Sequence, residues 1–498
     1  MTGPALWTAV AVTGPLLAAL IALVGRPRAL RAGLALGAGS SLAAVVGLAL
    51  GLVRDGPGRH LLGGWGRPLG IEMWVDGLTV VMLGMTAVVG AAVSVYATAY
   101  FAGLMDGPGD EPPAGRGARF FAPLWLFLWA ALNALYLSAD LFNLYVTVEL
   151  FGLSAAAIIT LAVSTRATFA GMRYLLVSLA GSMLFLLGVA LLYAVYGVLA
   201  LEELAQLAPS GVLPAVALAA MTVGMAAKTA LFPLHGWLPP AHSSAPAPGS
   251  ALLSALVVKA SFYIVLRLWV HVYGGGPADG LLLLGLLGGA AILWGSVLAL
   301  RQASLKRLIA YSTVAQVGYL FVMLPLLVTG PDPAAWSADA WNGGIYQAAS
   351  HALAKAAMFL AAGGMTYAVA RDDLASISGV ARRLPVSFFA FALAGLTMAG
   401  IPPSGGFIGK WLLIRSALAG GRWPWAVLLA VGGLLAAAYV VRALRHALED
   451  PLAEDGEFRA VPRRLEWSAM ALAVASVVLG LRPLELLQLL GIGGLQPW

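Results

Sequence analysis

The sequence predicts an all-α protein that crosses a membrane about fourteen times. Of its 498 residues, 61% are hydrophobic and only 10% are charged, whereas a soluble globular protein carries roughly 25% charged residues. Apolar windows of about 20 residues, the length that spans a bilayer, also recur along the whole chain. With so little charge the surface cannot be mostly wet, and we expect no soluble domain.

The apolar windows give the expected spans in order. They are residues 4–25, 29–53, 74–103, 120–138, 140–164, 168–197, 211–232, 250–273, 280–300, 304–328, 342–370, 385–418, 424–447 and 465–488. The seventh breaks at Phe232-Pro233 and continues as a short half-helix to about residue 242. The twelfth breaks at residues 400–406, which read Gly-Ile-Pro-Pro-Ser-Gly-Gly. Such breaks are tolerated in a membrane where they line a cavity or pack against protein.

The two broken spans lie five helices apart, which points to an internal repeat. Interrupted spans at corresponding places in two halves are typical of inverted repeats with an ion site at the breaks. We therefore expect two inverted five-helix repeats, helices 4–8 and helices 9–13. The expected parts of the chain are residues 1–118 with helices 1–3, 119–275 with the first repeat, 276–448 with the second, and 449–498 with helix 14.

Basic residues in alternate connections predict the orientation. They follow helices 1, 5, 9, 11 and 13: Arg26, Arg28 and Arg31; Arg166 and Arg173; Arg301, Lys306 and Arg307; Arg371, Arg382 and Arg383; and Arg442, Arg445, Arg459, Arg463 and Arg464. By the positive-inside rule that side is cytoplasmic, which places both termini outside. The net charge of +7 therefore reflects topology, and we expect no nucleic-acid partner.

Composition also excludes several kinds of chemistry. The chain has no cysteine, which rules out disulfides, thiolate metal sites and cysteine nucleophiles. His235 and His242 are seven residues apart without a third ligand, a weak metal signal. No Gly-x-Gly-x-x-Gly occurs in a strand–helix–strand context. We expect neither a cofactor nor a metal, and a chain that is not itself an enzyme.

The lysines are few and unusually placed. The chain has five, each within or at the edge of an expected span: Lys228, Lys259, Lys306, Lys355 and Lys410. Arginine stays charged, whereas a desolvated lysine can lose its proton near neutral pH. The pattern indicates that arginine sets the topology and that lysine occupies positions where protonation can switch.

Glu149, Lys228 and Lys259 are the first candidates for a proton path. Glu149 is the most deeply placed carboxylate, well inside span 140–164, and Lys228 adjoins the first break. A carboxylate ionises beside an ammonium, and separating the two weakens the hold of the lysine on its proton. The alternatives are a static buried pair that fixes packing and lysines that snorkel to an interface.

The second repeat offers three matching candidates. His351 and Lys355 are four residues apart, so they share one face of a helix and resemble consecutive proton stations. Lys410 follows the second break and mirrors Lys228, as an outlet to the far side would.

Four further residues have two open interpretations each. His235 and His242 either link a lysine to the cytoplasm or hold the first break together. Lys306 is either a relay member or a snorkelling lysine. Asp140 is more readily a helix-start cap or loop anchor than a relay member, and Asp76 has the same interpretation.

Several motifs are typical of one family. They are Asp140-Leu-Phe-Asn-Leu-Tyr-Val-x-x-Glu149, Lys228-x-x-x-x-Pro-x-His-x-Trp-Leu-Pro-x-Ala-His242, Leu-Lys306-Arg-x-x-Ala-Tyr-Ser, His351-x-x-x-Lys355 and Gly-x-Pro-Pro-x-x-Gly-Phe-x-x-Lys410. Together they resemble the antiporter-like subunits shared by respiratory complex I and Mrp cation/proton antiporters. The resemblance covers roughly residues 70–445. It implies fourteen helices with inverted repeats, a bacterial cytoplasmic (inner) membrane, and a central chain of lysines, histidines and a glutamate.

Within this family the chain looks most like MrpD-type subunits. The stretch Gly63-Gly-Trp…Pro68-Leu-Gly-Ile-Glu…Asp76 favours that type, and Lys410 stands where one complex I type has glutamate. The chain also ends soon after helix 14, without a long lateral helix. By resemblance Glu149 and Lys228 form the pair on helices 5 and 7. The relay residues would be Lys259, His351 and Lys355, with Lys410 at the exit. Gln347 departs from relatives that carry a second histidine there.

The sequence therefore supports a proton-translocating membrane subunit of a multi-subunit Na⁺/H⁺ antiporter. Its partners would be other membrane subunits of the same complex, the bilayer, protons and, in this interpretation, sodium. The alternative is a proton-pumping subunit of a complex I-like NADH:quinone oxidoreductase or of a membrane-bound hydrogenase. A scaffold without transport would have lost its titratable residues, and here they are kept. A variant of the first hypothesis couples proton flow, through a soluble partner, to uptake of another solute.

Overall fold

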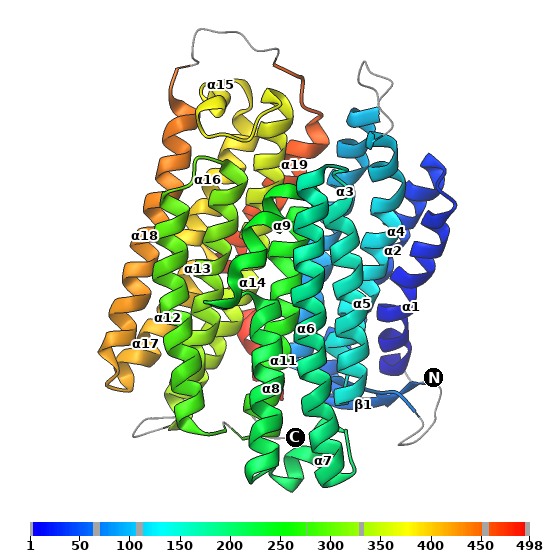
Figure 1. Ribbon diagram of the computed structural model, residues 1–498, viewed down its shortest axis with the longest axis vertical. Coiled ribbons are helices and arrows are strands. Elements are labelled where there is room, and N and C mark those ends of the chain that lie inside the picture. Colours follow the sequence, from blue (N-terminus) through cyan, green and yellow to red (C-terminus); the bar gives the residue numbers. More distant parts are fainter. Residues whose placement is uncertain are drawn as a thin grey trace.

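Long apolar helices run from one side of the molecule to the other (Figure 1). The computed structural model describes residues 3–62, 70–105, 113–274, 276–327, 333–450 and 458–493. Within these residues, thirteen helices are long and apolar enough to cross a membrane. The remaining expected span, 385–418, is built from two shorter helices on either side of a break. The prediction of a polytopic helical membrane protein with about fourteen spans is confirmed.

The region of the first three spans contains a strand pair that the sequence did not predict. The spans are α1 (Gly3–Leu23), α2 (Pro27–Asp55) and α3 (Gly77–Met105). Between the last two, β1 (Gly58–Leu61) and β2 (Glu72–Val75) form an antiparallel hairpin that pairs Gly58 with Val75. The predicted Gly63–Pro68 part of the family motif lies outside the described residues.

The first expected repeat contains the first break. Its elements are α4 (Pro113–Leu137), α5 (Leu141–Thr160), α6 (Thr165–Tyr196), α7 (Leu201–Leu207), α8 (Val212–Thr229), η2 (Leu234–Trp237), α9 (Leu238–Ser244), α10 (Ala247–Leu252), η3 (Leu253–Val257), α11 (Val258–Leu266) and η4 (Arg267–Val272). Helix α8 ends where Ala230 adopts a left-handed conformation, with φ of 60°. The chain resumes after Pro233 as η2 and α9. Pro239 and Pro240 lie in the first turn of α9, where the missing proline amide costs no hydrogen bond.

The second expected repeat contains the second break. Its elements are α12 (Ala278–Leu300), α13 (Leu305–Leu326), α14 (Pro333–Val369), η5 (Ala375–Ile377), α15 (Val380–Arg383), α16 (Pro385–Ala399), α17 (Gly405–Ala419) and α18 (Trp423–Leu448). Helix α16 ends at Gly400, with φ of 79°. In α17 the Ser404 hydroxyl caps the new helix by accepting from the Phe407 amide. Both predicted breaks are confirmed, whereas the inverted relation of the two repeats stays a prediction.

The last span is shorter than expected. Helix α19 (Arg463–Leu481) ends seven residues before the predicted residue 488, and α20 (Pro483–Gly491) follows as a separate helix. The cause is Pro483, because the residue before a proline is pushed out of the helical region. Arg482 accordingly has φ −126° and ψ 66°. The expected boundary at 118/119 likewise falls inside α4 rather than between helices.

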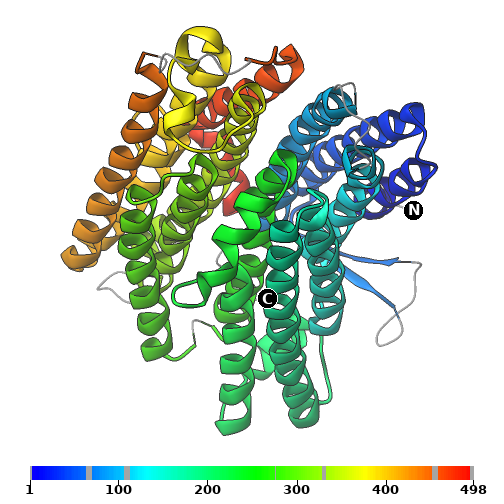
Figure 2. The ribbon, with the colours of Figure 1, turned by 45° about the horizontal axis from the view of Figure 1, so that its top comes forward.

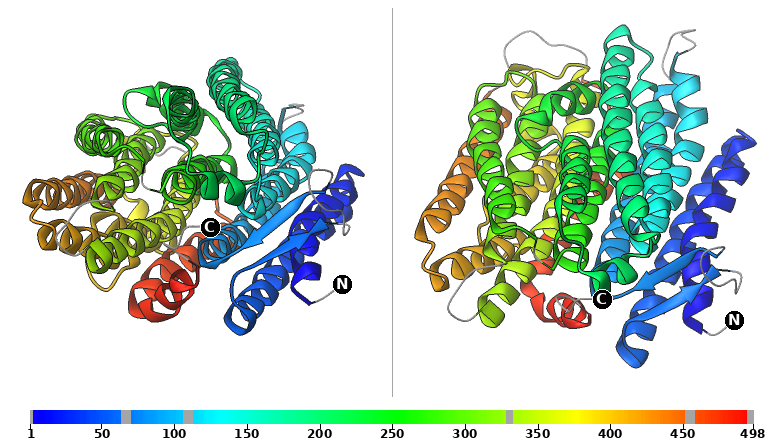
Figure 3. Two further views of the ribbon diagram at one scale, coloured as in Figure 1. Left: turned by 90° about the horizontal axis from the view of Figure 1, so that it is seen from below. Right: turned by 60° about the horizontal axis from the view of Figure 1, so that its bottom comes forward.

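Burial shows which spans form the interior. The span Ala247–Val272 is fully buried and α13 is 94% buried over its apolar window, whereas α2 and α18 are 28% and 33% buried. Figures 2 and 3 agree with these buried shares. The green helices lie between a blue group with α1 and α2 at one end and an orange group with α18 at the other. The lysine-bearing helix α11 therefore lies in the most enclosed part of the molecule.

Gly406 controls how closely α16 and α17 approach across the second break. A Cβ at this position would collide with the Thr397 carbonyl oxygen, and a backbone atom cannot move aside. Overpacking of this kind typically costs about 1–3 kcal/mol. We expect Gly406→Ala to lower the unfolding temperature of the detergent-solubilised protein. Gly236→Ala, in the first break where an added Cβ meets nothing within 4 Å, should leave it unchanged. Equal melting of both variants would contradict the tight approach.

Candidate functional site

Five of the predicted site residues are buried side chains on four different spans. Lys228 is 2% exposed, Lys259 and Lys355 are 0%, His351 is 1% and Lys410 is 5%. They belong to α8, α11, α14 and α17. An ionisable group within a membrane span is costly and marks an ion or proton pathway by default. The sequence identified all five.

Lys228 lies in a polar pocket between α5, α6 and α8. Its Nζ donates to Ser178 Oγ at 2.7 Å and stands 5.3 Å from the centre of the Phe151 ring. Gly152 makes room for this arrangement, because a Cβ there would lie 2.7 Å from Ser178 Oγ and 3.4 Å from Lys228 Nζ. The ammonium is thus held by a hydroxyl and an aromatic face.

Glu149 faces the same region without touching the lysine. It is half-buried, and its Oε1 is buried without a hydrogen-bond partner. It acts on Lys228 electrostatically, yet among the described ion pairs no Glu149 oxygen comes within 4 Å of the Lys228 ammonium. We call this arrangement an open pair: Glu149 and Lys228 face the same region without an ion-pair contact, and the Ser178 hydroxyl is the direct partner of the ammonium.

Lys259 is held by an irregular turn of its own span. The π-helical segment η3 precedes α11, and Lys259 Nζ donates to the Ser254 carbonyl in that segment at 2.5 Å. The Ser254 hydroxyl in turn hydrogen-bonds Thr313 Oγ1 at 2.8 Å. Single π turns inside α-helices occur frequently at functional sites. Here the turn supplies a backbone carbonyl to a buried ammonium and links α13 to it.

His242 is a buried histidine on which the charges of two of the lysines act. It is fully buried, and neither ring nitrogen has a hydrogen-bond partner. Lys355 and Lys259 both lie within electrostatic range of it. Trp237 and Phe359 flank the ring at centroid distances of 6.2 and 5.7 Å. A histidine surrounded by ammonium groups and aromatic rings has two open nitrogens for a proton or a water molecule.

Lys355 and His351 form the next pair, one turn apart on α14. Lys355 Nζ donates to the Ile309 carbonyl at 2.9 Å and to the Ser312 hydroxyl. Both nitrogens of His351 are buried without a hydrogen-bond partner, and Lys259, Lys355 and Lys410 all lie within its electrostatic range. The charges that act on His351 therefore come from one lysine of the first expected repeat, Lys259, and two of the second, Lys355 and Lys410.

Lys410 takes its partner from the second break. Its Nζ donates to the Met398 carbonyl at 2.5 Å and stands 4.6 Å from the centre of the Tyr319 ring. Gln316 also donates to that carbonyl, at 3.4 Å, and accepts from Gln347 at 2.8 Å. The glutamine that departs from the family pattern thus belongs to an amide link between α14, α13 and the Lys410 site.

The four residues with open interpretations are not part of this row, except His242. Asp140 is the N-cap of α5 and accepts from the Asn143 amide at 2.7 Å, which confirms the cap. Lys306 donates to the Ala245 carbonyl at 3.0 Å. His235 is half-buried and stacks on Phe232 at a centroid distance of 5.6 Å. In the part of the chain that the structure describes, no group of three or more histidine, cysteine, aspartate or glutamate residues could hold a metal ion.

The sequence analysis missed one buried charge cluster. Arg267 is 1% exposed and pairs in bidentate geometry with Asp76, which is fully buried, at 2.6 and 2.8 Å. Arg267 also donates to the hydroxyls of Tyr263 and Thr79, each at 3.0 Å. The interpretation of arginine as a topology marker is therefore wrong for Arg267. The signal was available in the sequence, because Arg267 lies within the apolar span Ala247–Val272, where a buried guanidinium needs a carboxylate partner.

Comparison with known proteins assigns most of the chain to one family. Residues 138–436 match the family described as NADH:quinone oxidoreductase/Mrp antiporter, TM. The NADH-quinone oxidoreductase subunit N of Desulforudis audaxviator is 36% identical, over 88% of this chain and 87% of the relative. The D-type Na⁺/H⁺ antiporter subunit of Alkalihalophilus pseudofirmus is 29% identical, over 75% of this chain and 72% of the relative.

Solved structures that match this chain also include both an Mrp complex and a respiratory complex I. A chain in the Mrp complex from Dietzia sp. DQ12-45-1b matches with a TM-score of 0.88 and 26% identity, over 99% of this chain and 97% of that chain. A chain of respiratory complex I from Thermus thermophilus matches with a TM-score of 0.73 and 25% identity, over 97% and 98%. The fold of this chain is thus similar to membrane subunits of both kinds of complex.

The Asp76–Arg267 pair should be essential for stability. Removing one partner of a buried ion pair leaves an uncompensated charge, at a cost of about 3–5 kcal/mol. We expect Asp76→Asn to lower the unfolding temperature in detergent strongly, or to prevent accumulation of folded protein. Arg54→Gln is the matched control, because the Arg54–Asp55 pair is exposed, with 78% and 44% of the two side chains accessible. A similar loss in both variants would show that the buried pair has no special weight.

Proposed function

This chain belongs to the NADH:quinone oxidoreductase/Mrp antiporter transmembrane family, and we propose that it translocates protons as the D-type subunit of a multi-subunit Na⁺/H⁺ antiporter. The observation that carries the proposal is the row of buried lysines and histidines, none of which is paired with a carboxylate within 4 Å among the described residues. An uncompensated buried ammonium gives up its proton more readily than one in an ion pair. Such a row is suited to passing protons and unsuited to static structure.

We propose an order of stations from the family resemblance, supported by which charges act on one another. Lys228 and Glu149 come first, then Lys259 and His242, then Lys355 and His351, and finally Lys410. Approach of the Glu149 carboxylate favours protonated Lys228, and withdrawal favours release of the proton toward the next station. The open pair seen here corresponds to the releasing state.

The spaces between stations differ in character. Trp237 lies beside His242, with ring centroids 6.2 Å apart, and its indole donates at 2.8 Å to the carbonyl of Ala227, the residue before Lys228. The Tyr174 ring packs against the indole at a centroid distance of 4.9 Å. An aromatic barrier of this kind must admit water before a proton passes. Between His351 and Lys410 the hydrogen-bonded amides of Gln347 and Gln316 occupy the space instead. Amides do not titrate in this range, so we propose that water carries the proton past them.

Two observations bear on the driving reaction. The TM-score of 0.88 to the Mrp complex chain, against 0.73 to the complex I chain, favours the antiporter. The identity of 36% to an NADH-quinone oxidoreductase subunit N, against 29% to a D-type antiporter subunit, favours a redox-driven complex as the second candidate. The subunits that copurify with the chain distinguish them, since a redox complex must contain iron–sulfur subunits.

Lys228→Gln should abolish proton transport. We expect everted vesicles that carry the complete complex to show sodium-dependent proton movement with the unmodified chain and little or none with the variant, while the complex stays assembled. Arg54→Gln, at an exposed ion pair, should transport normally. Unchanged transport by Lys228→Gln would make the lysine structural. Proton movement that requires an electron donor and ignores sodium would favour the redox-driven complex.

Gly152→Ala tests the Lys228 pocket without removing a charge. The added methyl would press on Ser178 Oγ at 2.7 Å and on Lys228 Nζ at 3.4 Å, displacing their hydrogen bond. A hydrogen bond to a charged group is worth about 1.5–3 kcal/mol, so we expect transport to fall about tenfold or more. Ser178→Ala should produce a similar loss. Gly39→Ala, which meets nothing within 4 Å, serves as the control, and a wild-type rate in Gly152→Ala would refute the role of this contact.

A further inference from the structure

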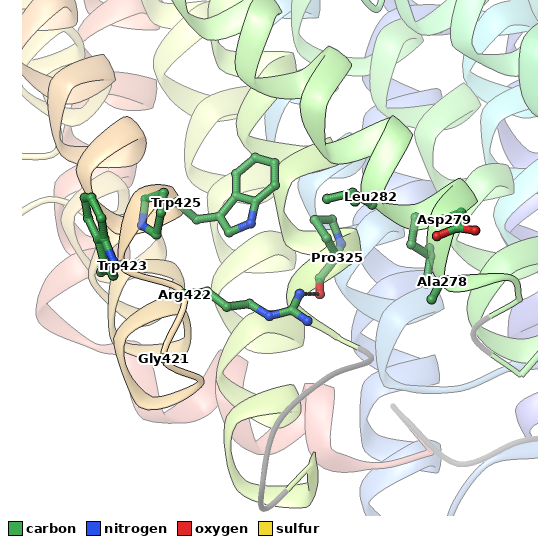
Figure 4. A pocket seen from close by; sticks show the side chains of 10 residues that line it. Ala278, Asp279, Leu282, Pro325, Gly421, Arg422, Trp423 and Trp425 are labelled. Carbon is green, nitrogen blue, oxygen red and sulfur yellow. Dashed lines mark hydrogen bonds between the residues drawn. The ribbon is translucent and has the colours of Figure 1, made fainter.

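A pocket opens on the side of the molecule opposite the arginine-rich connections, away from the row of lysines. It lies between the start of α12, the end of α13 and the turn that joins α17 to α18 (Figure 4), and its volume is about 440 Å³. Its walls combine charged, aromatic and aliphatic side chains. The residues used below are Asp279, Leu282, Arg422, Trp423 and Trp425.

Two opposite charges line the pocket from different elements. Arg422 is half-buried, and its Nη1 donates to the Pro325 carbonyl at 2.8 Å. That single bond fixes the guanidinium, which has five N–H donors in all. Asp279 is exposed in the first turn of α12, where a carboxylate also favours the helix dipole. Figure 4 shows the two side chains entering from opposite walls of the pocket. The pocket therefore offers an anion site and a cation site together.

Two tryptophans place the pocket at the depth of the lipid headgroups. Trp423 is 65% exposed, and Trp425 packs against Gly285 of α12, where a Cβ would lie 3.2 Å from its ring. Tryptophan is enriched at the membrane–water interface, because its ring is amphipathic. The charges of Arg422 and Asp279 thus lie where phosphate and amine groups of phospholipids are found.

An aliphatic surface continues from the pocket toward the bilayer centre. Leu282 lines the pocket and is 44% exposed, while Leu286 and Leu293 are 55% and 43% exposed. Their spacing of four and seven residues places all three on one face of α12. Acyl chains that hang from a headgroup in the pocket would cover this face.

From these features we propose that the pocket binds a zwitterionic phospholipid with a primary amine, a phosphatidylethanolamine. Its phosphate would bind the Arg422 guanidinium, its ammonium would donate to the Asp279 carboxylate, and its acyl chains would lie along Leu282, Leu286 and Leu293. Phosphatidylglycerol would satisfy Arg422 with its phosphate, but its neutral glycerol headgroup would bring no positive charge to the Asp279 carboxylate. A free phosphate would leave the leucine face uncovered.

Native mass spectrometry of the purified complex tests this site. The complex is reconstituted in nanodiscs that contain equal amounts of phosphatidylethanolamine and phosphatidylglycerol, then released and analysed for retained lipid. We expect the unmodified complex to retain phosphatidylethanolamine preferentially. Arg422→Gln and Asp279→Asn should each reduce that preference at least about threefold. Asp279→Asn changes an exposed carboxylate only, so it reports on the site even if Arg422→Gln weakens the fold.

Arg482→Gln is the matched control. Arg482 is an exposed arginine that pairs with Glu485 elsewhere on the surface, and its loss should leave lipid retention unchanged. The proposal is overturned if the two pocket variants retain phosphatidylethanolamine as the unmodified complex does, or if phosphatidylglycerol is retained equally well. It is also overturned if inorganic phosphate alone displaces the lipid, or if a partner subunit proves to occupy the pocket in the assembled complex.

Discussion

The cost of burying a positive charge in a membrane governs how this molecule is built. Each buried lysine has a neutral oxygen as partner. These are the Ser178 hydroxyl for Lys228, the Ser254 carbonyl for Lys259, the Ile309 carbonyl for Lys355 and the Met398 carbonyl for Lys410. A neutral partner lowers the free-energy cost of burying the ammonium but does not cancel its charge. Each lysine can therefore still lose its proton. The irregular helices follow from this need. The Ser254 carbonyl comes from a π segment and that of Met398 from the end of a broken span.

Arg267 shows the opposite solution within the same protein. A guanidinium cannot lose its proton in practice, so its burial requires a full counter-charge and a saturated set of acceptors. Asp76, Thr79 and Tyr263 supply them. The result joins α3 to the end of the most deeply buried span. The two types of buried cation thus have different roles: the arginine fixes the packing, and the lysines can titrate.

The lipid-facing side follows the same electrostatic rule on a larger scale. Spans α1, α2, α18 and α19 are the least buried, at 28–33% of their apolar windows, and charge there is confined to connections and interfaces such as the Arg422 turn. The lysines and histidines of the row lie in the interior, where protein dipoles can solvate them. This separation explains how a chain with only 10% charged residues can place so many of its lysines and histidines in one internal row.

The sequence alone determined most of the spans, both breaks and the buried lysines, because hydrophobic length, proline and an isolated lysine are local signals. It misjudged the end of helix 14 at Pro483 and did not predict the short hairpin, since element boundaries depend on weaker local preferences. Only the tertiary structure decided the partners. Arg267 and Asp76 are 191 residues apart in the chain, Lys228 and Ser178 are 50 apart, and Gln347 and Gln316 are 31 apart. Such pairs are set by which helix faces meet, and that is a property of packing which no single stretch of sequence contains.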